Sequence, residues 1–407
     1  MSPTGVYSFI KPETLLKLLL PRTAENRYDS AIGNFLSKEA RMFSRKIVPF
    51  TQPKRILIVR FSAIGDVVHG LPFAVALRTR FPHAEIAWLV ESKTASLLHG
   101  HWALDRLIIV RKGWMKSWAE VGLMRKRLHA FAPDVTIDLQ GLFKSSFAAW
   151  LSGAKYRIGF GGPDGREGSR WLNNYRVVPT EDHVIDRNLQ LLEPFGVAGC
   201  SVDFDLPECE MDRRSAKNLL RREGLDGDFA IINVGAGWKA KLWREDRYAA
   251  VAKYLLEQWN LPSLVVWAGS EERTMAEAVV QGTDGAAILA PPTTLNELTA
   301  LSRRATLFIG SDTGPLHIAA AVGTRCVGLY GPMPAKRNGP YGAQNRSLQI
   351  RSLEGTKISP HRAPRDLMDA IGVEFVCDAC DTILTELTER NEMTTPFRES
   401  RELPRAA

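Results

Sequence analysis

Cysteine is scarce in this sequence, which contains only five in 407 residues. An odd and sparse count favours a reducing compartment over a disulfide-stabilised secreted protein. Cys377 and Cys380 have CxxC spacing, but no second pair and no nearby histidine completes a zinc site. The pair also stands late in a terminal helical pattern, whereas a redox CxxC opens a helix after a strand. We therefore expect both thiols to have a structural role.

Long apolar runs and an excess of acidic residues are also missing. No run approaches the roughly 20 residues that span a bilayer, and the leucine-rich start lacks the features of a signal peptide. Lys and Arg number 53 against 45 Asp and Glu, which gives a net charge of +8. This balance favours a nucleotide, a phosphorylated substrate or an anionic membrane as partner. Because no nucleic-acid-binding module is recognisable, we expect no nucleic acid.

What the chain does have is an alternation of short apolar strands and amphipathic stretches from Arg55 onward. This pattern is typical of a parallel sheet covered on both faces, and it restarts after a linker. It predicts an α/β protein with two doubly wound, Rossmann-like domains that face each other across a cleft. The expected parts are an N-terminal helical extension (1–53), a first domain (54–196), a linker (197–211), a second domain (212–363), a helical segment (364–390) and a disordered tail (391–407).

Ten strands are expected, five in each domain. The predicted strands of the first domain are Arg55–Phe61, Glu85–Val90, Arg106–Val110, Asp134–Leu139 and Tyr156–Phe160. Those of the second are Phe229–Val234, Ser263–Ala268, Ala286–Leu289, Thr306–Ile309 and Cys326–Tyr330. In the extension, Thr23 to Val48 has the pattern of an amphipathic helix, which we interpret as packed on the domain surface; the alternative is a basic element on an anionic membrane.

The first chemically suggestive segment is Arg55 to Pro72, a strand, a tight turn and a helix start. It places one carboxylate, Asp66, at the beginning of the helix, where the positive end of the helix dipole favours a charged carboxylate. Ligands of doubly wound sheets bind at the carboxyl ends of strands, which is where Asp66 stands. Asp66 is thus a candidate catalytic base, although a plain helix cap would use the same residue type.

The second domain has an anion-binding signal in the segment from Phe308 to Ala321. A buried strand leads into Asp312, and Gly314-Pro315 then opens a helix of small residues, whose free amides suit a diphosphate. A simple strand–helix turn capped by Asp312 is the alternative. Two further turns end neighbouring strands: Gly235 to Trp243, where Lys241 can neutralise a phosphate, and Trp267 to Glu272, whose carboxylates can bind sugar hydroxyls.

These segments resemble glycosyltransferase family 9, the lipopolysaccharide heptosyltransferases, which have the GT-B fold. Ser62 to Pro72 resembles the N-terminal signature and Asp312 to His317 the C-terminal one. Three other stretches are most similar to heptosyltransferase I: Asp138 to Ser145, Gly165 to Glu167, and His183 to Asn188. The resemblance covers the chain from about Arg55 to Cys380.

The resemblance implies a set of site residues. Asp66 takes the place of the catalytic aspartate and Lys241 that of the donor-phosphate lysine. The implied donor-binding residues are Ala236, Gly237, Lys241, Glu271, Asp312, Thr313, Gly314, Pro315, Leu316 and His317. Ala236 and Gly237 replace a threonine pair of heptosyltransferase I, and Ser270 or Glu272 can substitute for Glu271 as the match to the family's glutamate. Candidate acceptor-binding residues are Arg60, Lys144, Arg166 and Arg187.

The function that the resemblance implies is an inverting, metal-independent transfer of a heptose from an ADP-sugar to a phosphorylated inner-core or lipid A acceptor. No cofactor is expected beyond ADP-heptose as co-substrate, and the implied location is cytoplasmic, peripheral at the inner membrane. The Asp203/Asp205 and Asp226/Asp228 pairs resemble DxD metal motifs but do not end strands, so we interpret them as structural. Basic residues between Arg111 and Arg127, interleaved with Trp114 and Trp118, suit either a membrane surface or a solvated helix face.

Three alternatives stay open at this point. The donor or acceptor can be another sugar within the same family. A Rossmann oxidoreductase also has two doubly wound domains, but Arg55 to Gly65 has no GxGxxG. A non-catalytic nucleotide-binding protein would keep the diphosphate site and lack a base.

Overall fold

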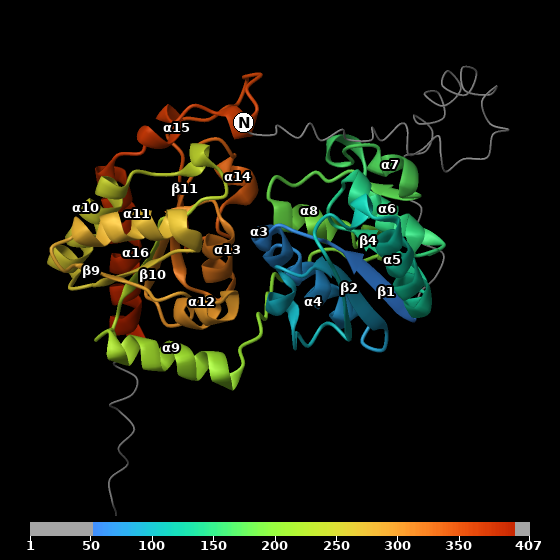
Figure 1. Cartoon of the computed structure of the whole chain (residues 1–407), viewed down its shortest axis with the longest axis horizontal. Helices are drawn as coiled ribbons and strands as arrows, with labels where there is room; N and C mark the ends of the chain where they lie inside the picture. Colours follow the sequence, from blue (N-terminus) through green and yellow to red (C-terminus); the bar gives the residue numbers. More distant parts are fainter. Residues whose placement is uncertain (1–51, 395–407) are drawn as a thin grey trace, which may run out of the picture. The chain divides into compact units, whose positions relative to one another are not determined.

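The computed structural model describes residues 52–394, so nearly all of the extension predicted over 1–53 and most of the predicted tail lie outside the described residues. Two six-stranded parallel sheets form the framework (Figure 1). The strands of the first are β1 (Arg55–Val59), β2 (Glu85–Glu91), β3 (Arg106–Val110), β4 (Val135–Asp138), β5 (Tyr156–Phe160) and β6 (Tyr175–Val177). The strands of the second are β7 (Ala230–Asn233), β8 (Ser263–Val266), β9 (Ala287–Leu289), β10 (Leu307–Ser311), β11 (Arg325–Leu329) and β12 (Arg346–Leu348).

Helices connect the strands of both sheets. The first half contains α3 (Ile64–Val68), α4 (Leu71–Arg80), α5 (Trp118–Phe131), α6 (Phe143–Leu151), α7 (Ser169–Leu172) and α8 (Val184–Gln190). The second half contains α9 (Glu210–Arg222), α10 (Glu245–Trp259), α11 (Gly269–Gln281), α12 (Leu295–Ser302), α13 (Gly314–Ala321), α14 (Ala335–Asn338), α15 (Asp366–Asp369) and α16 (Val373–Thr394). Short 3₁₀ helices are η2 (Ala95–Leu98), η3 (Trp114–Lys116), η4 (Gly162–Asp164), η5 (Glu193–Phe195), η6 (Lys239–Lys241) and η7 (Pro360–Arg362).

The two sheets share one topology. Their strand orders are β3-β2-β1-β4-β5-β6 and β9-β8-β7-β10-β11-β12, and all neighbouring strands are parallel. In each sheet the order reverses at the centre, between β1 and β4 and between β7 and β10. A doubly wound sheet binds its ligand at such a switch point, at the carboxyl ends of the strands. The fold thus offers one binding edge in each half.

The ten predicted strands are confirmed, with ends shifted by a few residues. Strands β6 and β12 were not predicted, because each has only three residues at a sheet edge and no apolar run to mark it. The amphipathic stretches expected between the strands are helices in the structure, as α4 and α5 show. Helix α16 continues to Thr394, beyond the predicted boundary at residue 390.

Buried apolar residues cover both faces of the second sheet. Helices α10, α11 and α16 pack on one face, and α9, α12 and α13 pack on the other (Figure 1). Cys377 and Cys380 belong to the first of these layers, both buried within α16, and burial raises the pKa of the Cys377 thiol to about 11. Within residues 52–394 no helix is long and apolar enough to cross a bilayer.

The beginnings of α3 and α13 meet without space for extra atoms. A methyl group on Gly65 would lie 2.5 Å from a ring carbon of His317, and one on Gly314 would lie 2.6 Å from Cβ of Ile64. Real Cβ atoms do not approach other atoms this closely. Two glycines therefore allow the switch-point edges of the two halves to come together.

Three histidine rings, those of His69, His183 and His317, lie close together beside this junction. The ring of His69 lies 4.2 Å from that of His317 and 6.0 Å from that of His183, measured between centroids. His69 is buried, and its Nδ1 has no hydrogen-bond partner among the described residues. Burial lowers the pKa of His69 well below its ordinary value of 6.5, and the neighbouring His317, His183, Arg60 and Arg337 lower it further. The junction therefore holds His69 neutral.

The close contact at Gly314 gives a first prediction. Gly314→Ala is expected to lower the free energy of unfolding, because the new methyl group displaces Cβ of Ile64 and with it helix α3. The decrease should be about 1–3 kcal/mol, the usual cost of overpacking, and urea unfolding measures it. Gly122→Ala is the control: Gly122 lies in α5 with open space around it, so alanine there should stabilise by roughly 0.5–1 kcal/mol. Equal effects of the two substitutions would contradict this account of the junction.

The buried imidazole gives a second prediction. The unfolded chain protonates His69 below about pH 6.5 whereas the folded chain does not, so the free energy of unfolding should fall as pH decreases from 7 to 5. Each such group contributes a slope of up to about 1.4 kcal/mol per pH unit. His69→Gln should flatten the slope measured by urea unfolding at several pH values, whereas His99→Gln, at an exposed position, should not. A slope unchanged in His69→Gln would refute the prediction.

Candidate active site

Asp66 is the third residue of α3, which follows the carboxyl end of β1 after the loop of residues 60–63. Its carboxylate forms an ion pair with Arg60 and accepts a hydrogen bond of 3.0 Å from the backbone N–H of Ala63. The Asp66 side chain is 41% exposed, whereas that of Arg60 is 8% exposed. Each carboxylate oxygen has two acceptor positions, so both keep one available for a ligand. The structure thus presents a fixed and accessible carboxylate at the first switch point.

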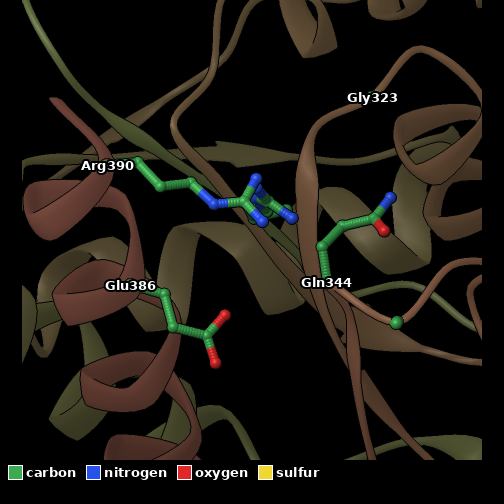
Figure 2. Close-up of a pocket in the computed structure, with 6 residues that line it drawn as sticks. Gly323, Gln344, Glu386 and Arg390 are labelled. Atoms are coloured by element: carbon green, nitrogen blue, oxygen red, sulfur yellow. The ribbon is translucent and has the colours of Figure 1, made fainter. Parts of the chain in front are cut away.

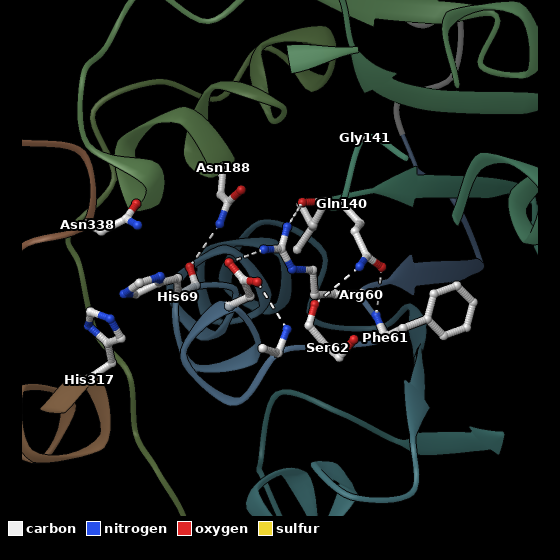
Figure 3. A network of polar contacts seen from close by, with 12 residues as sticks. Arg60, Phe61, Ser62, His69, Gln140, Gly141, Asn188, His317 and Asn338 are labelled. Carbon is white, nitrogen blue, oxygen red and sulfur yellow. Dashed lines mark hydrogen bonds and ion pairs between the residues drawn. The ribbon is translucent and has the colours of Figure 1, made fainter. Parts of the chain in front are cut away.

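The loop that carries Asp66 is held by the neighbouring strand. The buried carboxylate of Asp138, at the end of β4, accepts hydrogen bonds of 3.0 Å from the N–H groups of Gln140 and Gly141. The Gln140 side chain accepts from the N–H of Phe61 and donates to the carbonyl oxygen of Ser62, both at 3.2 Å (Figure 3). Asp138 and Gln140 therefore support the Asp66 turn from across the switch point.

In the second half, Lys241 and Asp312 meet at the matching switch point. Lys241 Nζ lies 2.6 Å from Asp312 Oδ2, and the Nε2 atom of His317 lies 3.1 Å from Asp312 Oδ1. Both members of the ion pair are largely buried. Burial by itself would raise the pKa of Asp312, but His317 and Lys241 together lower it to about 2. The family resemblance implied that these three residues bind the donor, and the structure brings them together.

The beginning of α13 completes this group. Asn233, at the end of β7, donates hydrogen bonds to the carbonyl oxygen of Gly235 at 3.1 Å and to Thr313 Oγ1 at 3.2 Å. Thr313 does not cap α13 with its side chain, so the first-turn amides of Gly314 and Leu316 remain available to an anion. The side chain of Leu316 is buried in the core and can contribute only its backbone. Pro315 offers no N–H.

The glycine turn after β7 lies beside this group. Lys241 also lies over the ring of Trp238, 4.4 Å from its centroid. Ala236 is half-buried and Gly237 is exposed. The turn therefore presents small residues and one paired cation next to the free amides of α13.

In the third turn, the two candidate glutamates differ in their surroundings. The predicted donor residue Glu271 is exposed, whereas the carboxylate of Glu272 lies directly over Gly235, 2.2 Å from the position that a methyl group there would take. Glu272 accepts a hydrogen bond of 2.8 Å from the N–H of Ala268, and burial raises its pKa. The starting residue of α11 decides which residue of its first turn faces the glycine turn. The sequence alone does not fix that starting residue.

The four predicted acceptor residues are all in the first half, but they differ in their surroundings. Arg60 is committed to Asp66 and to the carbonyl oxygen of Leu139. Lys144 Nζ lies 3.3 Å from Glu91 Oε1, and Arg187 binds both carboxylate oxygens of Asp164 at 3.0 and 3.1 Å. The side chain of Arg166 is exposed. Lys144, Arg166 and Arg187 are therefore the more accessible cations.

The basic segment from Arg111 to Arg127 is only partly as expected. Trp114 is buried and stacks on Phe147, because it fills the space between Phe61 and α6, so it cannot contact a membrane. Trp118 is 67% exposed at the start of α5. Exposed aromatic side chains on neighbouring helices, Trp150 and Trp171, were not singled out from the sequence.

Over the described ranges, no group of three or more His, Cys, Asp or Glu side chains is arranged to hold a metal ion. The aspartates of the DxD-like pairs have structural contacts: Asp205 accepts from Trp102 Nε1 and Asp228 from Thr306 Oγ1. A cavity of about 420 Å³ lies at the opposite edge of the second sheet, lined by Gly323, Arg325, Ala343, Gln344, Glu386 and Arg390 (Figure 2). It is separate from the switch-point residues because Arg325 begins β11, whereas ligands bind where strands end.

The chain is similar in sequence to characterised enzymes. The lipopolysaccharide core heptosyltransferase OpsX of Haemophilus influenzae is 29% identical over 311 residues, which cover 74% of this chain and 86% of that protein. Lipopolysaccharide heptosyltransferase 1 of Pseudomonas aeruginosa is 28% identical, with 71% of this chain and 81% of that protein covered.

Solved structures agree with the fold. A glycosyl transferase family 9 protein from Veillonella parvula superposes with a TM-score of 0.72 at 26% identity, covering 82% of this chain and 98% of the other. The E. coli heptosyltransferase WaaC with ADP gives a TM-score of 0.66 at 23% identity, with coverages of 81% and 99%, and supports the fold alone. The family model described as glycosyltransferase family 9 (heptosyltransferase) matches residues 121–361. Because that match spans more than half of the chain, the protein belongs to glycosyltransferase family 9, and it is a glycosyltransferase with the GT-B fold.

Proposed function

We propose that the protein transfers a heptose from ADP-heptose to a phosphorylated inner-core or lipid A acceptor of lipopolysaccharide, with inversion and without a metal ion. The observation that carries this proposal is the junction of α3 and α13, where the Asp66 turn and the Asp312 turn lie against each other. The relatives named lipopolysaccharide heptosyltransferase supply the substrate class. A structure of a relative bound to an ADP-heptose analogue supports the choice of donor.

The donor diphosphate belongs at the beginning of α13. The amides of Gly314 and Leu316 and the ammonium group of Lys241 supply positive charge there without a metal ion. Lys241 is already paired with Asp312. A bound diphosphate therefore shares the positive charge of Lys241 with the Asp312 carboxylate. Glu272, beside Gly235, is placed to accept hydrogen bonds from a donor hydroxyl group.

Asp66 acts as the base on the acceptor side. It removes the proton from the attacking hydroxyl group while the bond between the sugar and the diphosphate breaks, so one displacement inverts the anomeric carbon. A carboxylate is a weak base, and it suffices when proton transfer is late and the sugar is already oxocarbenium-like. The pair with Arg60 keeps Asp66 in a single orientation.

The acceptor contacts proposed here are Lys144, Arg166 and Arg187, with Arg60 as a positioning residue for Asp66. A lipid-linked acceptor implies a cytoplasmic protein that works at the inner-membrane surface, and the exposed Trp118 beside basic residues fits that location. No cofactor and no nucleic acid takes part in the proposed reaction. Family membership removes the oxidoreductase alternative.

Substitution of Asp66 is the central test. Asp66→Asn and Asp66→Ala should lower kcat for heptose transfer by roughly 10²- to 10⁴-fold, the usual contribution of a general base. ADP binding, followed by calorimetry, should change less than about twofold, because Asp66 lies in the acceptor half. Assays run in EDTA should give the wild-type rate. Near wild-type transfer by Asp66→Asn would overturn the proposal, and a wild-type protein that binds ADP-heptose without transferring it would favour a nucleotide-binding protein.

The two neighbouring glutamates allow a matched comparison on the donor side. Glu272→Gln should weaken ADP-heptose binding by about 10- to 100-fold, because a hydrogen bond to a charged group contributes roughly 1.5–3 kcal/mol. Glu271→Gln, one residue earlier and exposed, should bind as the wild type does. Calorimetric titration of both variants decides the point, and a larger loss in Glu271→Gln would return the role to Glu271.

A further inference from the structure

A short segment of the second half docks on the first half near the acceptor residues. Lys336 Nζ lies 2.5 Å from Asp182 Oδ2, the carbonyl oxygen of Gly339 lies 3.0 Å from His183 Nε2, and the hydroxyl group of Tyr341 donates to Asp186 Oδ1 at 2.9 Å. These contacts fix α14 and the residues after it against the beginning of α8.

Arg337 stands inside this docked segment and differs from its neighbours. Its one side-chain hydrogen bond is from Nη1 to Asn338 Oδ1, at 3.0 Å, and in the described part of the chain it forms no ion pair. The residue is half-buried. Burial lowers the pKa of Arg337, the carboxylates of Asp66 and Asp164 oppose that effect, and the cations Arg187 and Arg166 add to it. A cation from the second half is therefore held among cations of the first.

The nearby carboxylates do not neutralise this group. Asp164 is occupied by the bidentate contact with Arg187, and Asp66 is paired with Arg60. Of Arg166, Arg187 and Arg337, only Arg187 has a carboxylate partner among the described residues. A partly desolvated arginine without a carboxylate partner is unfavourable unless a ligand supplies the anion. The guanidinium fork matches the oxygen geometry of a phosphate group.

We propose that Arg337 binds a phosphate group of the acceptor together with Arg166 and Arg187. The proposal rests on the proposed function and adds to it a residue of the donor half that selects the acceptor. The consequence is that the acceptor contacts both halves, which links its binding to the docked position of α14. The charge of the phosphate group replaces the carboxylate that Arg337 lacks.

Steady-state kinetics with two acceptors tests this assignment: a phosphorylated lipid A inner-core acceptor and the same acceptor after phosphatase treatment. Arg337→Ala should raise KM for the phosphorylated acceptor on the order of 10- to 100-fold. It should leave KM for ADP-heptose within about twofold. On the dephosphorylated acceptor, the variant and the wild type should differ by less than about twofold. Arg337→Lys should be intermediate, because it keeps the charge and loses the fork.

Arg351→Ala is the control, since Arg351 is an exposed arginine of the same half, 3.6 Å from Asp366. The inference would be overturned if KM for the phosphorylated acceptor is unchanged in Arg337→Ala, or if KM rises equally for both acceptors. Heptose transfer by the wild-type protein would uphold the proposed function in either case. If the wild type transfers no heptose, the proposed function fails. Calorimetric binding of the two acceptors to wild type and Arg337→Ala then still decides whether Arg337 recognises the phosphate group.

Discussion

The structure depends on the close approach of two helix beginnings, α3 from the first half and α13 from the second. Gly65 lies against the ring of His317, and Gly314 lies against Ile64, with no room for a Cβ atom at either glycine. His317 is in turn held by Asp312, which pairs with Lys241. One packing contact thus joins the carboxylate proposed as base to the group proposed to hold the diphosphate. The binding edges of the two sheets meet at this contact because the two glycines leave space for it.

Charge compensation is the second constraint. Arg60 neutralises Asp66, and Lys241 neutralises Asp312, so each half carries a carboxylate already matched by a cation. A ligand that binds at such an ion pair does not leave either protein charge without a partner. This limits the free-energy cost of removing these charged groups from water. Arg337 is the exception among these groups, because Asp66 and Asp164, the carboxylates that act on it electrostatically, have other partners. The lack of a carboxylate partner among the described residues distinguishes Arg337 from an arginine with a structural role.

Much of the fold and part of the candidate site were accessible from the sequence. Apolar strands alternating with amphipathic helices predict two doubly wound sheets, since the burial of strands on both faces leaves a readable pattern. Glycine-containing turns after β1, β7 and β10 located Asp66, Lys241 and Asp312, because ligands bind at the ends of strands. The edge strands β6 and β12 left no such pattern, because three half-exposed residues carry no periodicity. Trp114 was misjudged because a tryptophan among basic residues looks the same in sequence whether it is buried or exposed.

The sequence by itself determined which residue types stand at the strand ends, and with them the family and the class of chemistry. Only the tertiary structure decided which side chains share a site. The rotation of α11 places Glu272 over Gly235 and leaves Glu271 exposed, which is the reason why Glu272 is the proposed donor residue. The contact of His69 with His317, and the position of Arg337 near Arg187, join residues more than a hundred positions apart. Local sequence encodes the period of a helix or strand and the residues of a turn, whereas contacts between halves depend on how whole sheets pack.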